Sequence, residues 1–168
     1  TKSLFLSHAT PPVMITGVRA RAEVAVRAGI RYIQFAVRPE EDAEAMDQYL
    51  KQIEPVASPY LVDGELSESA KRGEAIFQKA GCANCHPGPL YTDLQKYDVG
   101  TGTERDAGLK FDTPTLVEIW RTGPYLVRGQ AKSIMEVLTK YNPNDNHGKT
   151  SDLSEQELKD LAEYVLSL

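Results

Sequence analysis

The chain has 168 residues, of which 41 % are hydrophobic and 26 % are charged. It carries 24 acidic and 19 basic side chains, for a formal net charge of −5, which argues against nucleic acid as a partner. A chain of this size forms one ordinary hydrophobic core or two small ones, and no apolar run approaches the ~20 residues of a membrane span.

Two amphipathic helices are predicted in the first third of the chain, at residues 20–28 and 39–53. Their apolar side chains recur every three or four residues, as on one face of a helix. These side chains are Ala22, Ala25 and Val26 in the first helix, and Ala43, Met46, Tyr49, Leu50 and Ile53 in the second. Two prolines then mark a linker over residues 55–64.

A third helix is predicted from Ser67, a favourable N-cap residue, through Gln78. Gly73 and Phe77 lie one turn apart on this helix. Glycine in mid-helix costs about 1 kcal/mol, which a close helix crossing would offset. The third helix is therefore expected to cross another helix at Gly73.

The run Cys82-Ala83-Asn84-Cys85-His86 follows this helix. Two cysteines separated by two residues and followed by histidine form the attachment signature of a c-type haem. Each thiol adds to one porphyrin vinyl group, and the imidazole binds the iron. The sequence therefore predicts one covalent haem c, with Cys82, Cys85 and His86 as cofactor-binding residues and His86 as an iron ligand.

Three other interpretations of this run are weaker. A zinc site needs about four ligands, and the chain has only 2 cysteines and 3 histidines. A thioredoxin-like redox pair is expected near a βαβ pattern, which is not evident here. A structural disulfide across two intervening residues would be strained. Because covalent haem is attached outside the bacterial cytoplasm, a periplasmic or otherwise extracytoplasmic location is expected. No secretory signal precedes Thr1, so we expect that the natural N-terminus has been removed.

An internal repeat relates the two ends of the chain. Capping boxes at Ser133 and Ser154 open helices predicted at 133–141 and 154–168. The apolar positions of these helices match those of the first two helices at offsets of 112 and 115 residues. Residues 1–54 are therefore interpreted as the rear half of a first cytochrome c-like module without a haem motif. Residues 65–168 form a whole module, in which Gly73 and Phe77 are expected to meet the terminal helix.

The stretches Phe111-Asp112-Thr113-Pro114-Thr115-Leu116 and Thr122-Gly123-Pro124-Tyr125-Leu126 resemble the bacterial di-haem cytochrome c peroxidase and MauG superfamily. The resemblance implies two cytochrome c modules, with an electron-storing haem in the C-terminal one and a peroxide-binding haem in the N-terminal one. The sequence departs from the family at Val127 and Arg128, where histidine and aspartate are usual, and at Val117, where arginine is usual. These losses count against catalysis within this chain.

The second axial ligand of the iron is expected just before the terminal helix, where no methionine follows Met135. His147 would give a six-coordinate, low-spin iron of low potential, so it is the predicted metal ligand alongside His86. Its ordinary alternative is a solvent-exposed loop histidine. Tyr141 is the second candidate, although its place on a helix face also suits core packing. An open iron position is the third.

These observations predict an all-α fold: one cytochrome c-like module with a covalent haem, preceded by the C-terminal part of a related module. The expected function is one-electron transfer through the haem. The alternatives are a fragment of a di-haem peroxidase or MauG-like oxidase, and a non-catalytic structural or docking module. The expected partners are a redox protein, for which the acidic charge suggests a basic surface, and the missing N-terminal part of the parent chain.

Overall fold

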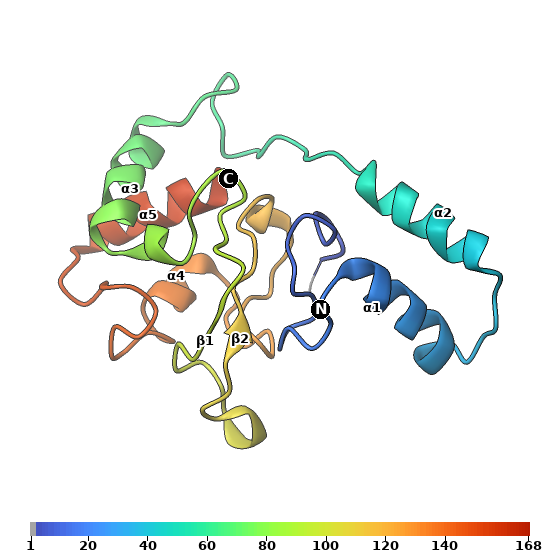
Figure 1. Ribbon diagram of the computed structural model, residues 1–168. Helices are drawn as coiled ribbons and strands as arrows, with labels where there is room; N and C mark the ends of the chain where they lie inside the picture. Colours follow the sequence, from blue (N-terminus) through green and yellow to red (C-terminus); the bar gives the residue numbers. More distant parts are fainter. Residues whose placement is uncertain (1–2) are drawn as a thin grey trace.

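The structure, a computed structural model, describes residues 3–168 and has two parts joined by an extended segment (Figure 1). One part holds the first two helices, and the other holds the remaining three around the C-terminus. None of the described helices is both long and apolar enough to cross a membrane. In chain order the helices are α1 (Ala22–Ala28), α2 (Glu40–Lys51), α3 (Glu68–Lys79), α4 (Ile134–Leu138) and α5 (Glu155–Leu166). A π-helical turn, Gly29–Ile33, extends α1.

The prediction of an all-α fold is wrong in one detail, because the structure contains a small antiparallel sheet. Strand β1 (Lys96–Tyr97) pairs with β2 (Phe111–Asp112), with Lys96 opposite Asp112. The chain between the haem motif and α4 has no helical apolar period and is rich in glycine, proline and threonine. The short antiparallel pairing closes the loop between the two strands and provides hydrogen-bond partners for backbone N–H and C=O groups there.

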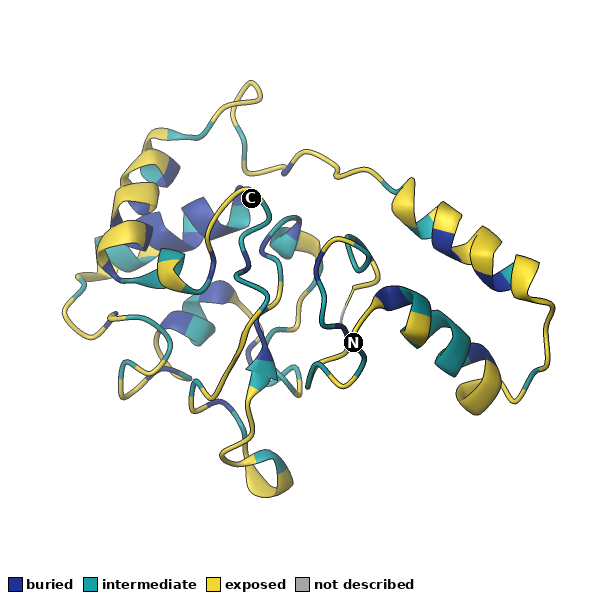
Figure 2. Ribbon diagram, viewed as in Figure 1, coloured by how far each residue is buried: buried dark blue, intermediate teal, exposed yellow. Residues whose placement is uncertain are grey.

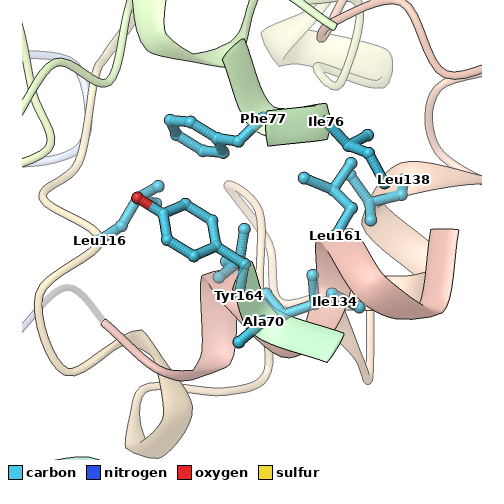
Figure 3. Close-up of a cluster of buried hydrophobic side chains, with 10 residues drawn as sticks. Ala70, Ile76, Phe77, Leu116, Ile134, Leu138, Leu161 and Tyr164 are labelled. Carbon is cyan, nitrogen blue, oxygen red and sulfur yellow. The ribbon is translucent and has the colours of Figure 1, made fainter. Parts of the chain in front are cut away.

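The core of the second part is the crossing of α3 and α5 (Figure 3). A Cβ atom added to Gly73 would lie 2.0 Å from the carbonyl oxygen of Asp160, so only glycine permits this approach. Phe77 meets Tyr164 edge to face with ring centroids 5.3 Å apart. Leu161 is completely buried between the helices. The close crossing that Gly73 and Phe77 predicted is therefore confirmed.

The predicted helix starts are also confirmed. Ser67 accepts a hydrogen bond from the Ala70 N–H, and Ser154 forms a reciprocal capping box with Glu157. Ser133 accepts a hydrogen bond from the Glu136 N–H and so caps α4, but the predicted capping box is incomplete, because the Glu136 carboxylate accepts from the Lys132 N–H instead. Helix α4 ends at Leu138, earlier than the predicted 141. The chain then turns through a loop that is central to the site below.

An ion pair links the polar edges of α3 and α5. Arg72 donates from Nε to Oδ2 of Asp160 at 2.7 Å and from Nη2 to Oδ1 at 2.8 Å. Ser69 adds a third hydrogen bond at 2.6 Å. The Arg72 guanidinium holds the pKa of the Asp160 carboxyl well below its ordinary value.

Two residues of the 55–64 segment bond to the second part, although most of the segment is exposed. The Val56 N–H donates to a carboxylate oxygen of Glu118 at 2.5 Å, and the Ser58 hydroxyl donates to the Leu166 carbonyl at 2.6 Å. Both Glu118 and Ser58 are buried. These two hydrogen bonds tie the segment to the second part near the C-terminal end of α5.

Equivalent backbone features recur 112 residues apart. They are the isolated bridges Val13–Arg19 and Tyr125–Ala131, and the left-handed residue pairs Met14 with Leu126 and Gly17 with Gly129. Helices α2 and α5 each have 12 residues and begin 115 residues apart. Both offsets are those of the sequence repeat. The interpretation of residues 1–54 as the rear half of a module stays a prediction.

Candidate haem site

The Cys82–His86 run forms one tight turn directly after α3. Gly81 has a φ of 80°, a left-handed conformation that glycine adopts without strain and that ends the helix. The His86 N–H then donates to the Cys82 carbonyl at 2.9 Å, which closes the turn. Cys82 and Cys85 are both free thiols. The turn thus presents two thiols and one imidazole from a single rigid segment.

The His86 ring is buried and held in one orientation. Its Nδ1 donates to the carbonyl oxygen of Tyr91 at 2.9 Å, which leaves Nε2 free as a metal ligand. Tyr91 has a φ of 50°, and this turn aims its carbonyl at the ring. Burial lowers the pKa of His86, so the imidazole is neutral at neutral pH, as an iron ligand must be.

His147 faces His86 from the loop before α5. The two ring centroids lie 6.3 Å apart with an interplanar angle of 40°. Burial, together with the nearby His86, lowers the pKa of His147 to about 4. Its Nδ1 is buried and has no hydrogen-bond partner among the described residues. The alternative of a solvent-exposed loop histidine is therefore wrong, since His147 is half-buried and neutral.

Tyr141 does not lie opposite His86 in this way. Its hydroxyl donates to the carbonyl oxygen of Gln130 at 2.8 Å, and Lys140 lies over its ring at 5.0 Å. Of the two residues that the sequence proposed for the second axial position, the structure brings only His147 to face His86.

Comparison with known proteins decides the family. The cytochrome c family profile matches residues 70–168, more than half of the chain. The chain belongs to the cytochrome c family. Membership implies covalently bound haem c and electron transfer. The resemblance to the di-haem cytochrome c peroxidase and MauG superfamily is also confirmed by the relatives described next.

Three curated relatives match part of this cytochrome. Hydrazine synthase subunit gamma of Kuenenia stuttgartiensis is 34 % identical over 170 residues, covering 74 % of this chain and 48 % of that protein. Cytochrome-c peroxidase IdrP1 of Denitromonas iodatirespirans is 33 % identical, and the match covers 61 % of this chain and 41 % of that protein. Methylamine utilization protein MauG of Methylorubrum extorquens is 31 % identical, and the match covers 63 % of this chain and 36 % of that protein. The chain spans less than half the length of each relative.

Two solved structures share the fold. The first is Kuenenia stuttgartiensis hydrazine synthase pressurised with 20 bar xenon. The alignment covers all of this chain and 71 % of the hydrazine synthase chain, with a TM-score of 0.85 and 29 % identity. The second is a MauG-like protein associated with microbial copper homeostasis. The alignment covers all of this chain and 72 % of the MauG-like chain, with a TM-score of 0.76. At 16 % identity, the second match supports the fold alone.

The residues of this cytochrome fit a haem. With metal–nitrogen bonds of about 2.0–2.1 Å and ring nitrogens ~1.2 Å from their centroids, two axial imidazoles lie with centroids 6–7 Å apart. The 6.3 Å between His86 and His147 falls in this range. Burial raises the pKa of the Cys82 thiol to about 11, so the free thiol is protonated at neutral pH. Among residues 3–168, no group of three or more His, Cys, Asp and Glu side chains is placed to hold a metal ion.

Two features of the site escaped the sequence analysis. The Tyr91 carbonyl that orients His86 is a backbone group, and only a left-handed turn brings it to the ring. Asn142, which holds the His147 loop, stands in an Asn- and Pro-rich run that has no apolar period to mark it. Its burial was the missing signal.

Proposed function

We propose that residues 65–168 carry single electrons through one haem c, attached at Cys82 and Cys85 and ligated by His86 and His147. The observation that carries this proposal is the pair of imidazoles facing each other with ring centroids 6.3 Å apart. When bound, the haem supplies a reversible one-electron acceptor. The chain holds the first imidazole through the Tyr91 carbonyl and keeps both rings out of water.

Electron transfer is favoured over catalysis within this part of the chain. A peroxidase needs an open iron position, whereas two facing histidines fill both. Val127 also stands where the related enzymes have histidine. The net charge of −5 supports a redox partner with a basic surface. We propose a bacterial periplasmic location, in keeping with the related peroxidases and MauG proteins.

Absorption spectroscopy of the haem-loaded protein tests this function. The intact mass should exceed that of the polypeptide by one haem, and the ferric spectrum should be low spin. His147→Ala should convert it to high spin and allow carbon monoxide to bind the ferrous form. Tyr141→Phe is the control and should leave the spectrum unchanged, because this hydroxyl bonds Gln130. If His147→Ala stays low spin and Tyr141→Phe does not, Tyr141 is the ligand.

A second proposal is that the chain is part of a di-haem protein. The backbone features repeated at 112 residues support a first module in residues 1–54, whose haem-bearing front half would precede Thr1. The relatives named as a peroxidase and as MauG support the same architecture. A version that includes the preceding segment should bind two haems. If its peroxide turnover is absent while electron transfer persists, the fragment belongs to a relay or docking subunit rather than a peroxidase.

A further inference from the structure

The loop between α4 and α5 is organised around one buried side chain. Asn142 is only 4 % exposed. Its Oδ1 accepts a hydrogen bond from the His147 N–H at 2.9 Å. Its Nδ2 donates to the Gly148 carbonyl and to the Thr150 hydroxyl, each at 2.8 Å. The amide of Asn142 thus binds the backbone on both sides of the His147 side chain.

We propose that Asn142 is the positioning residue for His147, an inference that rests on the proposed axial role of His147. Ligating histidines ordinarily donate their second ring nitrogen to a protein acceptor, which fixes the ring. His86 does so through Tyr91, but Nδ1 of His147 has no partner among the described residues. The orientation of this ring therefore depends on its backbone, and Asn142 holds that backbone.

Two further contacts connect this arrangement to the rest of the module. The Thr150 hydroxyl donates to the Leu138 carbonyl at 2.8 Å, which ties Asn142 to the end of α4. The Lys149 N–H donates to the Ala80 carbonyl at 2.9 Å, directly before the Cys82 turn. The loop that carries His147 is therefore fastened both to α4 and to the segment that carries His86.

Gly148 completes the approach of the two segments. Its φ of 87° lies in the left-handed region, and a Cβ atom there would lie 3.3 Å from the Cys82 sulfur. The chain can therefore pass close beside the haem-attachment cysteine only with glycine at this position. Asn142 accepts from His147 and donates to Gly148, so it fixes this passage as well.

Two substitutions in the haem-loaded protein test the inference. Asn142→Ala removes all four hydrogen bonds of this side chain, and Thr150→Val removes the hydroxyl while keeping the volume. Each should weaken His147 coordination by about 10- to 100-fold, the usual effect of losing an outer partner of a metal ligand. The ferric spectrum should become a mixture of low and high spin, and carbon monoxide should bind the ferrous form correspondingly faster. Asn144→Ala, at an exposed asparagine of the same loop, should match the parent protein.

Covalent haem content by mass and helix content by circular dichroism should stay at parent values in the supporting result. If Asn142→Ala fails to fold, the spectrum of Thr150→Val decides. The inference is overturned if the folded variants keep the parent spin state and carbon monoxide rate while His147→Ala becomes high spin. That outcome leaves the proposed ligand intact. If His147→Ala itself changes nothing, the proposed ligation is wrong and the positioning role falls with it.

Discussion

Helices α2 and α5 have the same length and occupy equivalent places in the repeat, yet their apolar faces differ in exposure (Figure 2). On α5, Leu161 is 0 % exposed and Tyr164 is 3 % exposed. Their counterparts on α2, 115 residues earlier, are Met46 at 43 % and Tyr49 at 71 %. Helix α3 covers α5, whereas no described helix lies on this face of α2. Periodicity in a sequence reports that a face is apolar, and the covering partner decides whether it is buried.

The adjoining side of α2, which includes Ala43 at the edge of the same apolar face, is covered within its own part. Ala43 and Asp47 are buried, and Asp47 accepts a hydrogen bond from Arg27 of α1 at 2.6 Å. His8 lies 2.9 Å from the same carboxylate. In the first part, this polar contact between α1 and α2 adds to buried apolar side chains such as Ala22 and Ala43, while the second part is held mainly by a larger apolar cluster. The bare face of α2 supports the proposal that a helix equivalent to α3 belongs to the preceding segment.

Glycine substitutions should give the largest difference in stability between the two parts. Gly73→Ala should lower the free energy of unfolding by more than about 3 kcal/mol, because the added Cβ meets the Asp160 backbone at 2.0 Å. Gly29→Ala, at the end of α1, is the matched control. No atom lies within 4 Å of its added Cβ, so the change should be neutral or stabilising by about 0.5 kcal/mol. Urea denaturation of both variants measures the difference, and equal losses would refute the close crossing.

Substitutions at equivalent apolar positions of α5 and α2 provide a second test of the difference in burial. Leu161→Ala should cost about 3 kcal/mol, since it empties a completely buried site between α3 and α5. Met46→Ala should cost less than about 1 kcal/mol, because its side chain is already 43 % exposed. The same denaturation series checks both. In a version that includes the preceding segment, the cost of Met46→Ala should rise. An unchanged cost there would contradict the proposed covering helix.

Much of the second part could be predicted from sequence because its signals are local. Ser67 and Ser154 mark helix starts through hydrogen bonds to residues three positions on, and the Cys82–His86 run is contiguous. The prediction of His147 as a ligand rests on its place just before α5. The strands and the roles of Tyr91 and Asn142 could not be predicted in this way. They depend on irregular backbone, such as the positive φ at Tyr91, which no periodicity reports.

The polar edge of the crossing gives the smallest expected effect. Asp160→Asn should cost about 1.5 kcal/mol at neutral pH, because it weakens hydrogen bonds from Arg72 and Ser69 to a buried carboxylate. Glu155→Gln, which breaks an exposed pair with Lys159 on the same helix, is the control and should leave stability unchanged.

The pH dependence of the stability lost in Asp160→Asn tests whether the charge of Asp160 is the cause of that loss. Arg72 depresses the pKa of Asp160 below the ordinary 3.8 in the folded protein. The unfolded chain therefore takes up the proton first, and the ion pair contributes its full stability only above the unfolded pKa. As the pH falls below 3.8, the stability advantage of the parent over Asp160→Asn should shrink toward zero. Unfolding free energies measured across this range check the prediction, and an advantage that does not change with pH would show that shape alone, rather than charge, holds this edge of α3 and α5 together.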